Sequence, residues 1–539
     1  MIRLETLSLL TRDGVKLDAD IYRPDSDEKL PILLMRQPYG RKIASTVVYA
    51  HPRWYASQGY IVVIQDVRGR GTSEGNFRLF AHEVEDGEDT LAWLANLPGS
   101  TGEVGMYGFS YQGMTQLYAS ASLAPNLKAL CPAMIAWDLY RDWATENRAF
   151  CLQMNLGWAV QLAAASAQRR GDVFAFQELY QRSRQLSFTD ARPANPEWFH
   201  RLASDSFYHD WLRYPADHDY WRNLSPEFLC ESVDLPMLHI GGWFDPHLRG
   251  NLACFQAMSQ RTSPQRLVIG PWGHLPWGRK SGGIDYGPQA VSKIDELQIA
   301  WFNAILKGQD NGLLAEPPVQ VFELGRHRWL TRADFPTSTG ENWYLNSTGL
   351  ASIQETAGQF GPEPPLQPNV DTLVHDPWRP VPSVAGHAGF PSGQAERSAL
   401  DARADVLTYT SAPLSEPLAL LGIPEVCLEV TSDTPSFDLS VVLAEVRPDG
   451  SVYNLSQGYG RFERIPQQRV HFSLQALAAC IPSGHCLRLS IGGASFPAYD
   501  VNPGTGKSSA EAELIDQQVM TLTLALGNSY CRLPIGPGD

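Results

Sequence analysis

The chain has 539 residues, more than the ~250 to 300 at which a single hydrophobic core usually stops growing, so we expect several cores. Hydrophobic residues make up 43% and charged residues 19%, a composition that excludes disordered and fibrous proteins. The formal net charge of -15 argues against nucleic acid and against an anionic membrane surface as partners.

The cysteines and the N-terminal segment indicate a cytoplasmic protein. The eight cysteines contain no C-x-x-C pair, so we expect buried, unpaired thiols in a reducing compartment. Charged residues interrupt the N-terminus before the apolar region of a signal peptide could form. No later stretch approaches the ~18 apolar residues of a membrane span. We also expect no cofactor and no metal, because residues 310–312 match only part of a calcium loop.

The first third of the chain alternates strand-like and helix-like segments. The apolar, β-rich runs that predict strands are residues 16–22, 31–36, 60–66, 104–109 and 127–135. Residues 82–97 have the spacing of an amphipathic helix, and a second helix-like stretch follows residue 109. This alternation predicts an α/β fold with a mostly parallel sheet covered by helices on both faces.

The alternation breaks near residue 137, where a long helix-like insertion without a convincing strand begins. Strand-like runs return at residues 235–241 and 266–270, and residues 292–307 predict a helix. For this helix, Ser292 and Asp295 predict an N-terminal capping pair and Gly308 predicts the C-terminal cap.

Beyond residue 316 the chain becomes β-rich. The strand-like runs are 318–324, 406–410, 425–430, 439–446 and 519–526, with a long Pro- and Gly-rich stretch at about 360–394. We therefore expect an α/β catalytic domain (1–140 and 235–315), a helical cap (141–234) and a C-terminal β-sandwich (316–539).

A nucleophile motif lies between a predicted strand and a predicted helix. Residues 108–113 read GFSYQG, and this context places Ser110 on a sharp turn with its hydroxyl above the sheet. The following helix would offer a backbone N–H to an oxyanion. The motif departs from G-x-S-x-G, because Gln112 stands where the second glycine is usual.

A serine nucleophile needs a base, and the base needs an acid that orients it. In α/β-hydrolases these follow the serine in the order acid, then histidine, after later strands. Asp245 follows the strand ending near residue 241, and His274 follows the next strand. We predict that Ser110, Asp245 and His274 form the catalytic triad.

Three other polar residues fit the triad less well. His239 lies within a predicted strand, and His247 is too close to Asp245 in sequence to receive its carboxylate while reaching Ser110. Asp66 also follows a strand, but its Arg and Gly neighbours favour an ion-paired turn near the site. We interpret the two histidines as packing or pocket residues.

Five motifs together resemble the cocaine esterase and X-prolyl dipeptidyl-peptidase family, which includes α-amino acid ester hydrolases and cephalosporin acylases. They are QPYGRK (37–42), QDVRGRG (65–71), VGMYGFSYQG (104–113), GWFD (242–245) and GPWGH (270–274). The family writes its elbow as G-x-S-Y-x-G, which accommodates Gln112. The resemblance covers essentially the whole chain and implies a jelly roll for the C-terminal domain.

The resemblance also implies an oxyanion hole and a pocket. The oxyanion donors would be the Tyr39 hydroxyl and the backbone N–H of Tyr111. Trp143 and Trp158 would line the acyl pocket, with His247 as a further substrate-binding residue. Members that accept α-amino esters place acidic residues after the triad aspartate, where this chain has 246–248 as Pro-His-Leu. We therefore expect little affinity for a free α-amino group.

The leading hypothesis is a serine hydrolase that cleaves a small-molecule carboxylic ester through an acyl-enzyme. The alternative is an acylase or X-prolyl dipeptidyl-peptidase that uses the same triad on an amide. A third hypothesis, a β-rich domain that binds carbohydrate beside an inactive core, fits less well because Ser110, Asp245, His274 and Tyr39 are all present. A homo-oligomer is compatible with the sequence, and the natural substrate stays open.

Overall fold

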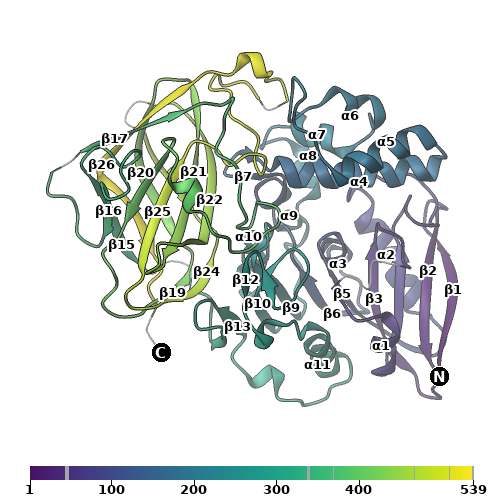
Figure 1. The fold of residues 1–539 in the computed structure, drawn as a ribbon. Coiled ribbons are helices and arrows are strands. Elements are labelled where there is room, and N and C mark those ends of the chain that lie inside the picture. The colour runs from purple at the N-terminus through teal and green to yellow at the C-terminus, as the bar shows by residue number, and fades with distance from the viewer. Residues whose placement is uncertain (43–47, 337–339, 368, 466–467, 509, 537–539) are drawn as a thin grey trace.

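The computed structural model describes residues 1–42, 48–336, 340–367, 369–465, 468–508 and 510–536. It has three parts, namely an α/β hydrolase domain, a group of cap helices and a β domain (Figure 1). The N-terminus lies at the outer edge of the hydrolase domain, and the β domain lies on the opposite side of the molecule. Within the described residues, no helix is both long and apolar enough to cross a bilayer.

The hydrolase domain is built on a ten-stranded sheet with the order β1-β2-β4-β3-β5-β6-β9-β10-β13-β14. The seven strands from β4 to β13 in this order run parallel to one another, and β1, β2 and β14 join antiparallel at the edges. The strands are β1 (Ile2–Leu10), β2 (Lys16–Pro24), β3 (Leu30–Gln37), β4 (Ile61–Asp66), β5 (Ser100–Phe109), β6 (Leu127–Ala133), β9 (Met237–Phe244), β10 (Gln265–Gly273), β13 (Val319–Glu323) and β14 (Arg328–Arg332).

Apolar side chains cover both faces of this sheet because strand residues alternate between the faces. On β3, Ile32 and Leu34 pack into one core cluster, whereas Leu33 and Met35 pack into another. The first cluster contains side chains of α2 (Glu83–Leu94) and α3 (Tyr111–Ala121), and the second contains those of α1 (Pro52–Ser57) and α11 (Ile294–Leu306). The predicted parallel sheet with helices on both faces is confirmed.

The cap is helical, as predicted. Its helices are α4 (Leu152–Arg170), α5 (Val173–Arg184), α6 (Glu197–Leu202), α7 (Phe207–Arg213), α8 (Asp219–Leu224) and α9 (Pro226–Leu229). A short π-helical turn (Tyr140–Ala144) and the two-residue strands β7 (Thr145–Glu146) and β8 (Ala149–Phe150) precede them. The cap helices lie together over one end of the hydrolase sheet (Figure 1).

The β domain contains a second large sheet with the order β22-β21-β25-β18-β16-β15-β26-β20-β23, and β17 also pairs with β26. Two further strands, β19 and β24, pair with each other. The strands are β15 (Glu341–Ser347), β16 (Gly358–Gly361), β17 (Val370–His375), β18 (Val406–Thr410), β19 (Leu418–Gly422), β20 (Glu425–Ser432), β21 (Ser436–Val446), β22 (Val452–Glu463), β23 (Gln468–Ser473), β24 (Leu477–Ile481), β25 (Cys486–Gly492) and β26 (Met520–Leu533).

One hairpin that follows the expected boundary at residue 316 pairs with the hydrolase sheet. The strand β13 pairs in parallel with β10, and β14 pairs with β13, so residues 319–332 extend the hydrolase sheet. A β-rich run carries no signal about which sheet it joins, since pairing is decided by tertiary contacts. The β domain packs against this same edge, and one core cluster contains Trp243 and Val321 together with Leu428.

The helix α11 forms and its apolar face is buried, but only half of the predicted capping pair is found. The Ser292 hydroxyl accepts a hydrogen bond of 3.3 Å from the Ile294 N–H, although Lys293 is the N-cap residue of the helix. The Asp295 carboxylate instead accepts hydrogen bonds from the Tyr55 hydroxyl and from the Ala50 backbone N–H. Gly308 has the left-handed φ of +62° that the C-terminal prediction requires.

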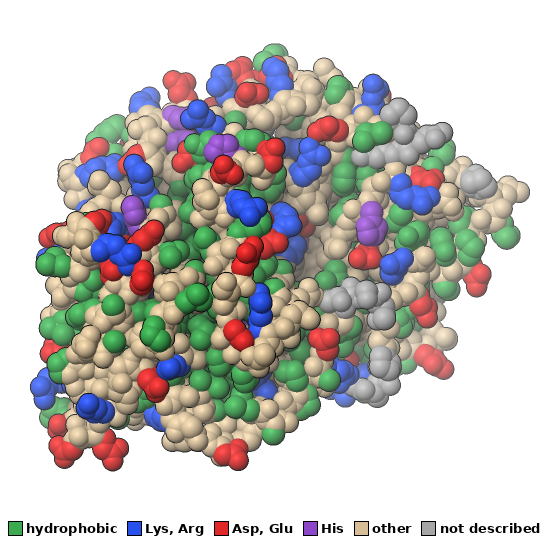
Figure 2. Space-filling view, turned by 180° about the vertical axis from the view of Figure 1, so that it is seen from behind, with side chains coloured by type: hydrophobic (Ala, Val, Ile, Leu, Met, Phe, Trp, Pro, Cys, Tyr) green, Lys and Arg blue, Asp and Glu red, His purple; other side chains and the backbone are tan. Residues whose placement is uncertain are grey.

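The surface carries charges of both signs. Figure 2 shows acidic and basic side chains interspersed over one face of the molecule, without a continuous patch of one sign. All eight cysteines are free, and all except Cys486 are buried. Burial raises the pKa of Cys131, as expected of an unreactive thiol in an apolar core.

Candidate active site

Ser110 lies on the turn between β5 and α3, in the strained backbone of a nucleophile elbow. Its φ of 59° and ψ of -126° fall outside the regions that most residues occupy. A Cβ atom at Gly108 would lie 2.4 Å from the Cβ of Gln112, and one at Gly113 would lie 2.7 Å from the carbonyl oxygen of Ala133. The close contact between α3 and the sheet is therefore at Gly113. This explains why position 112 can carry the side chain of Gln112.

His274 and Asp245 meet as predicted. The imidazole Nδ1 of His274 lies 2.7 Å from Oδ1 of Asp245, and the carboxylate is fully buried. Asp245 directly follows β9 and His274 directly follows β10, so the parallel pairing of these strands brings the two residues together. The ring of Phe109, next to Ser110 in the chain, lies 5.5 Å from the His274 ring. An ionised carboxylate at this place would hold the proton on Nδ1 and leave Nε2 as the base.

Tyr39 presents its hydroxyl to Ser110. The indole N–H of Trp158 donates a hydrogen bond of 3.1 Å to the Tyr39 oxygen. Burial raises the pKa of Tyr39 to about 12, although hydrogen bonds with Trp158 and Ser110 act in the opposite direction. Because the Tyr39 oxygen accepts from Trp158, its own proton is available for donation to another oxygen.

Tyr111 has two separate environments for its backbone and its side chain. It is the first residue of α3, where a backbone N–H has no acceptor within the helix. Its buried hydroxyl donates a hydrogen bond of 2.6 Å to Glu83, and Glu83 forms an ion pair of 2.7 Å with Arg36. These contacts fix the start of α3 and hence the direction of the Tyr111 amide.

A cavity of about 790 Å³ opens beside His274, within the range of small-molecule pockets. Trp143 and Trp158 line it, and their rings stack 5.1 Å apart. The cap helix α5 and the β-domain segment 387–392 supply further walls. All three parts of the fold therefore shape this pocket, and the two predicted tryptophans belong to it.

A buried charged cluster forms part of the same wall. The Glu146 carboxylate accepts hydrogen bonds from Arg249 (2.7 Å), from His387 (2.8 Å) and from the Tyr499 hydroxyl (2.6 Å). Burial opposes ionisation, yet the charges of Arg249 and His387 lower the pKa of Glu146 to about 2. The sequence analysis missed this cluster because its members lie far apart in the chain and share no motif.

His247 was predicted to bind substrate, but it is not among the residues that line the cavity. Its ring is buried behind Trp143, with the ring centres 4.2 Å apart, and it lies 5.3 Å from the His274 ring. Burial lowers the pKa of His247 to about 4, so it is a neutral packing residue. His239 is fully buried on β9 and contacts Gln265 at 2.9 Å, as a core histidine would.

Asp66 forms the predicted ion-paired turn. Its carboxylate lies 2.6 Å from the Arg41 guanidinium, and its neighbour Arg68 pairs with Asp86 at the same distance. A Cβ atom at Gly71 would collide with the Asp66 carboxylate at 1.9 Å, so the turn requires glycine there. Asp66 is therefore engaged away from His274.

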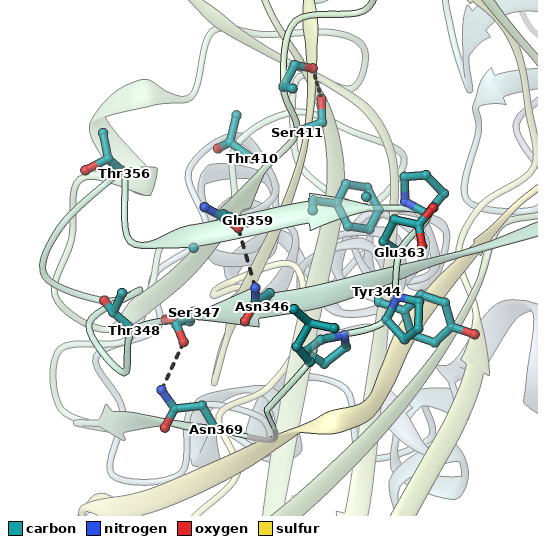
Figure 3. A pocket seen from close by; sticks show the side chains of 18 of the residues that line it. Tyr344, Asn346, Ser347, Thr348, Thr356, Gln359, Glu363, Asn369, Thr410 and Ser411 are labelled. Atoms are coloured by element: carbon teal, nitrogen blue, oxygen red, sulfur yellow. Dashed lines mark hydrogen bonds between the residues drawn. The ribbon is translucent and has the colours of Figure 1, made fainter.

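A second, larger hollow of about 1300 Å³ lies on the β domain, along β15 and β16 (Figure 3). Its polar side chains bond within the domain: Asn346 donates to Gln359 at 3.5 Å, and Asn369 donates to the Ser347 carbonyl at 2.9 Å. No residue of the predicted triad lines it. In the described part of the chain, no group of three or more His, Cys, Asp or Glu is arranged to hold a metal ion.

An elbow serine, together with a histidine and a buried aspartate that follow successive parallel strands, defines a serine hydrolase of the α/β-hydrolase class. The family model described as X-Pro dipeptidyl-peptidase (S15 family) matches residues 13–276, and the model of that family's C-terminal non-catalytic domain matches residues 311–525. Cocaine esterase of Rhodococcus sp. (strain MB1 Bresler) is 30% identical over 93% of this chain and 92% of its own length. The chain belongs to this family of serine hydrolases.

Solved structures share the fold over almost the whole chain. An aminopeptidase from a marine sediment archaeon, Thaumarchaeota archaeon, has a TM-score of 0.82 with 22% identity, covering 99% of this chain and 96% of its own. An α-amino acid ester hydrolase has a TM-score of 0.79 with 22% identity, covering 99% of this chain and 97% of its own. The three-part architecture is therefore common to enzymes that are named for different substrates.

Proposed function

We propose that this protein hydrolyses small carboxylic esters through an acyl-enzyme on Ser110. The observation that carries the proposal is the 2.7 Å contact between His274 and the buried Asp245, set beside an elbow serine. The similarity to cocaine esterase supports an ester as the substrate. The cavity of about 790 Å³, with its two tryptophans, suits a small aromatic or bulky acyl group.

The reaction follows from these positions. His274 Nε2 takes the Ser110 proton as the serine oxygen attacks the ester carbonyl, and the carbonyl electrons move onto its oxygen. The Tyr39 hydroxyl and the Tyr111 amide stabilise this oxyanion, after which His274 gives the proton to the departing alcohol. Water, deprotonated by the same histidine, then attacks the acyl-enzyme and releases the acid and Ser110.

The carboxylates near the pocket are already engaged by other groups, and this favours a substrate without a free α-amino group. Pro246 follows the triad aspartate, and Glu146 is already engaged by Arg249, His387 and Tyr499. Asp142 accepts backbone hydrogen bonds from Trp137 and Asp138. Capped or unsubstituted acyl esters should therefore have a higher kcat/KM than the matching α-amino esters. A preference for phenylglycine methyl ester over phenylacetate methyl ester would contradict this.

Paired p-nitrophenyl ester and p-nitroanilide substrates with one acyl group test the proposal. We expect turnover of the ester, labelling of Ser110 alone by a fluorophosphonate, and loss of turnover by several orders of magnitude in Ser110→Ala. Labelling of another serine would refute the assignment. A higher kcat/KM for the anilide would instead favour an acylase or an X-prolyl dipeptidyl-peptidase, the activity that the family description names.

We also propose a cellular location for the protein and a topology for the β domain. We infer a cytoplasmic location from the eight free thiols and a jelly-roll topology for the β domain from the family match over residues 311–525. Full activity in a reducing buffer fits the first proposal. Loss of activity under such conditions would contradict it.

A further inference from the structure

Arg70 is a buried cation whose environment sets it apart from its neighbours. In the stretch from Asp66 to Gly71, Arg68 pairs with two carboxylates, and Arg41 pairs with Asp66. The Arg70 side chain is buried, yet among the described residues no carboxylate lies within 4 Å of it. Its Nε has no hydrogen-bond partner in the described chain. A buried charge without a counter-charge is costly, so its retention calls for a reason.

The turn that carries Arg70 aims it at the cap. Gly69 has a φ of +70°, and a Cβ atom there would lie 2.2 Å from the Phe77 backbone nitrogen, so glycine lets the loop close on itself. This closure brings the Phe77 ring under the guanidinium, 3.7 Å from its centre. One terminal nitrogen of Arg70 then donates a hydrogen bond of 3.0 Å to the Leu162 carbonyl on α4.

These contacts place the cation beside the oxyanion hole. Leu162 and Trp158 are four residues apart, on one face of α4, and Trp158 is the residue that donates to the Tyr39 oxygen. The Phe77 ring that stacks on Arg70 lies 6.0 Å from the Tyr111 ring. Burial lowers the pKa of Arg70 to about 10, and the nearby hydroxyl groups of Tyr111 and Tyr39 partly offset this shift.

We propose that Arg70 is a positioning residue for the oxyanion hole. Its hydrogen bond to α4 holds this helix so that Trp158 orients Tyr39. The positive charge of Arg70 meets a negative charge only when the substrate carbonyl becomes an oxyanion. The inference rests on the proposed hydrolysis at Ser110. A fixed charge in a water-poor site stabilises developing negative charge without reorganisation at the moment of reaction. The Arg70 charge therefore stabilises the transition state and changes the binding of the neutral ester only a little.

Three variants separate charge from packing. Arg70→Gln removes the charge and keeps a polar amide, but its shorter side chain loses the hydrogen bond to the Leu162 carbonyl, whereas Arg70→Lys keeps the charge. Arg169→Met is the matched control, because Arg169 also ties α4 to this loop, through the Gly71 carbonyl at 2.7 Å, but is exposed. Loss of one direct oxyanion donor lowers the rate by on the order of 10² to 10³. Because the Arg70 charge acts without direct contact with the oxyanion, its loss should lower the rate by about tenfold to thirtyfold.

We expect Arg70→Gln to lower kcat for a p-nitrophenyl ester by that factor with KM within about threefold, and Arg70→Lys to recover most of the loss. The Ki of phenylboronic acid, which forms an anionic tetrahedral adduct with the serine, should rise in parallel. The Kd of the neutral ester for a Ser110→Ala background should not change. Thermal unfolding checks that each variant is folded.

The proposal is overturned if Arg70→Gln keeps wild-type kcat, if boronate and neutral ester lose affinity equally, or if Arg169→Met reproduces the loss. If Arg70→Gln does not fold, the test rests on Arg70→Lys, which keeps the charge. A folded lysine variant whose kcat shows the full loss of about tenfold to thirtyfold expected for removal of the charge would contradict a role for the charge. If the wild type hydrolyses no ester, the proposed function fails, while the boronate affinities still test Arg70.

Discussion

At the scale of single residues, the site depends on which atom holds which proton. The Tyr39 oxygen accepts from Trp158, so its own proton is left to donate, and the His274 Nδ1 faces Asp245, so Nε2 is left as the base. Ser110, Asp245, His274 and Tyr39 were all predicted from local motifs. The Trp158 hydrogen bond was not, because sequence gives no side-chain direction.

Removal of the Tyr39 hydroxyl tests its role as an oxyanion donor. Tyr39→Phe keeps the ring and should lower kcat by on the order of 10² to 10³, or about 3 to 4 kcal/mol, because the hydrogen bond strengthens as charge moves onto the carbonyl oxygen. Acylation by a p-nitrophenyl ester under single-turnover conditions measures this loss. A folded variant that acylates within about threefold of wild type would leave the Tyr111 amide as the sole named donor.

The pH dependence of acylation tests the same hydroxyl. Burial raises the pKa of Tyr39 to about 12, above the value near 10 of a free phenol, so the residue keeps its proton and donates throughout the alkaline range. The single-turnover acylation rate should therefore stay constant between about pH 8 and pH 9, below the range in which Arg70 would titrate. A fall by half within this interval, absent from Tyr39→Phe, would show that the phenol ionises earlier than its burial implies.

At the scale of elements, α3 must lie close to the sheet for the elbow to form. Gly113 is within a helix, where alanine is normally favoured, but its added methyl would meet Ile135 at 2.4 Å and the Ala133 carbonyl at 2.7 Å. Backbone atoms of the sheet cannot move aside without loss of packing. The requirement for glycine at this position thus arises from contact between two elements.

Substitution of Gly113 by alanine should destabilise the protein by about 1 to 3 kcal/mol, the usual cost of overpacking, and lower activity as the elbow shifts. The control is Gly157→Ala in α4, where the nearest atom to the new methyl is the Leu186 side chain at 3.3 Å. Thermal unfolding and ester turnover of both variants are the measurements. Equal effects of the two substitutions would show that helix propensity, and not the contact with the sheet, governs Gly113.

At the scale of the whole molecule, buried histidines link stability to pH. Burial lowers the pKa of His239 and of His247 to about 4, whereas an unfolded histidine titrates near 6.5. Because the folded pKa lies below the unfolded one, these residues stabilise the fold fully above about pH 6.5, and this contribution is lost as pH falls toward 4.

The free energy of unfolding should therefore decrease between pH 6.5 and pH 4 by about 3 kcal/mol for each histidine at most. Urea unfolding at several pH values measures this. His239→Gln, which removes one of the two groups, should lessen the pH dependence in that interval. An unchanged slope would mean that His239 is not held neutral in the folded protein.

The sequence by itself determined the parallel sheet, the helical insertion and the order of Ser110, Asp245 and His274, since strand periodicity and strand-end motifs are local properties. Tertiary structure alone decided that the 319–332 hairpin joins the hydrolase sheet and that His247 lies behind Trp143. It also brought Glu146, Arg249, His387 and Tyr499 into one cluster and, among the residues that the structure describes, left no carboxylate within 4 Å of Arg70. The physical reason is that strand pairing, burial and charge compensation depend on contacts between residues that are distant in the chain.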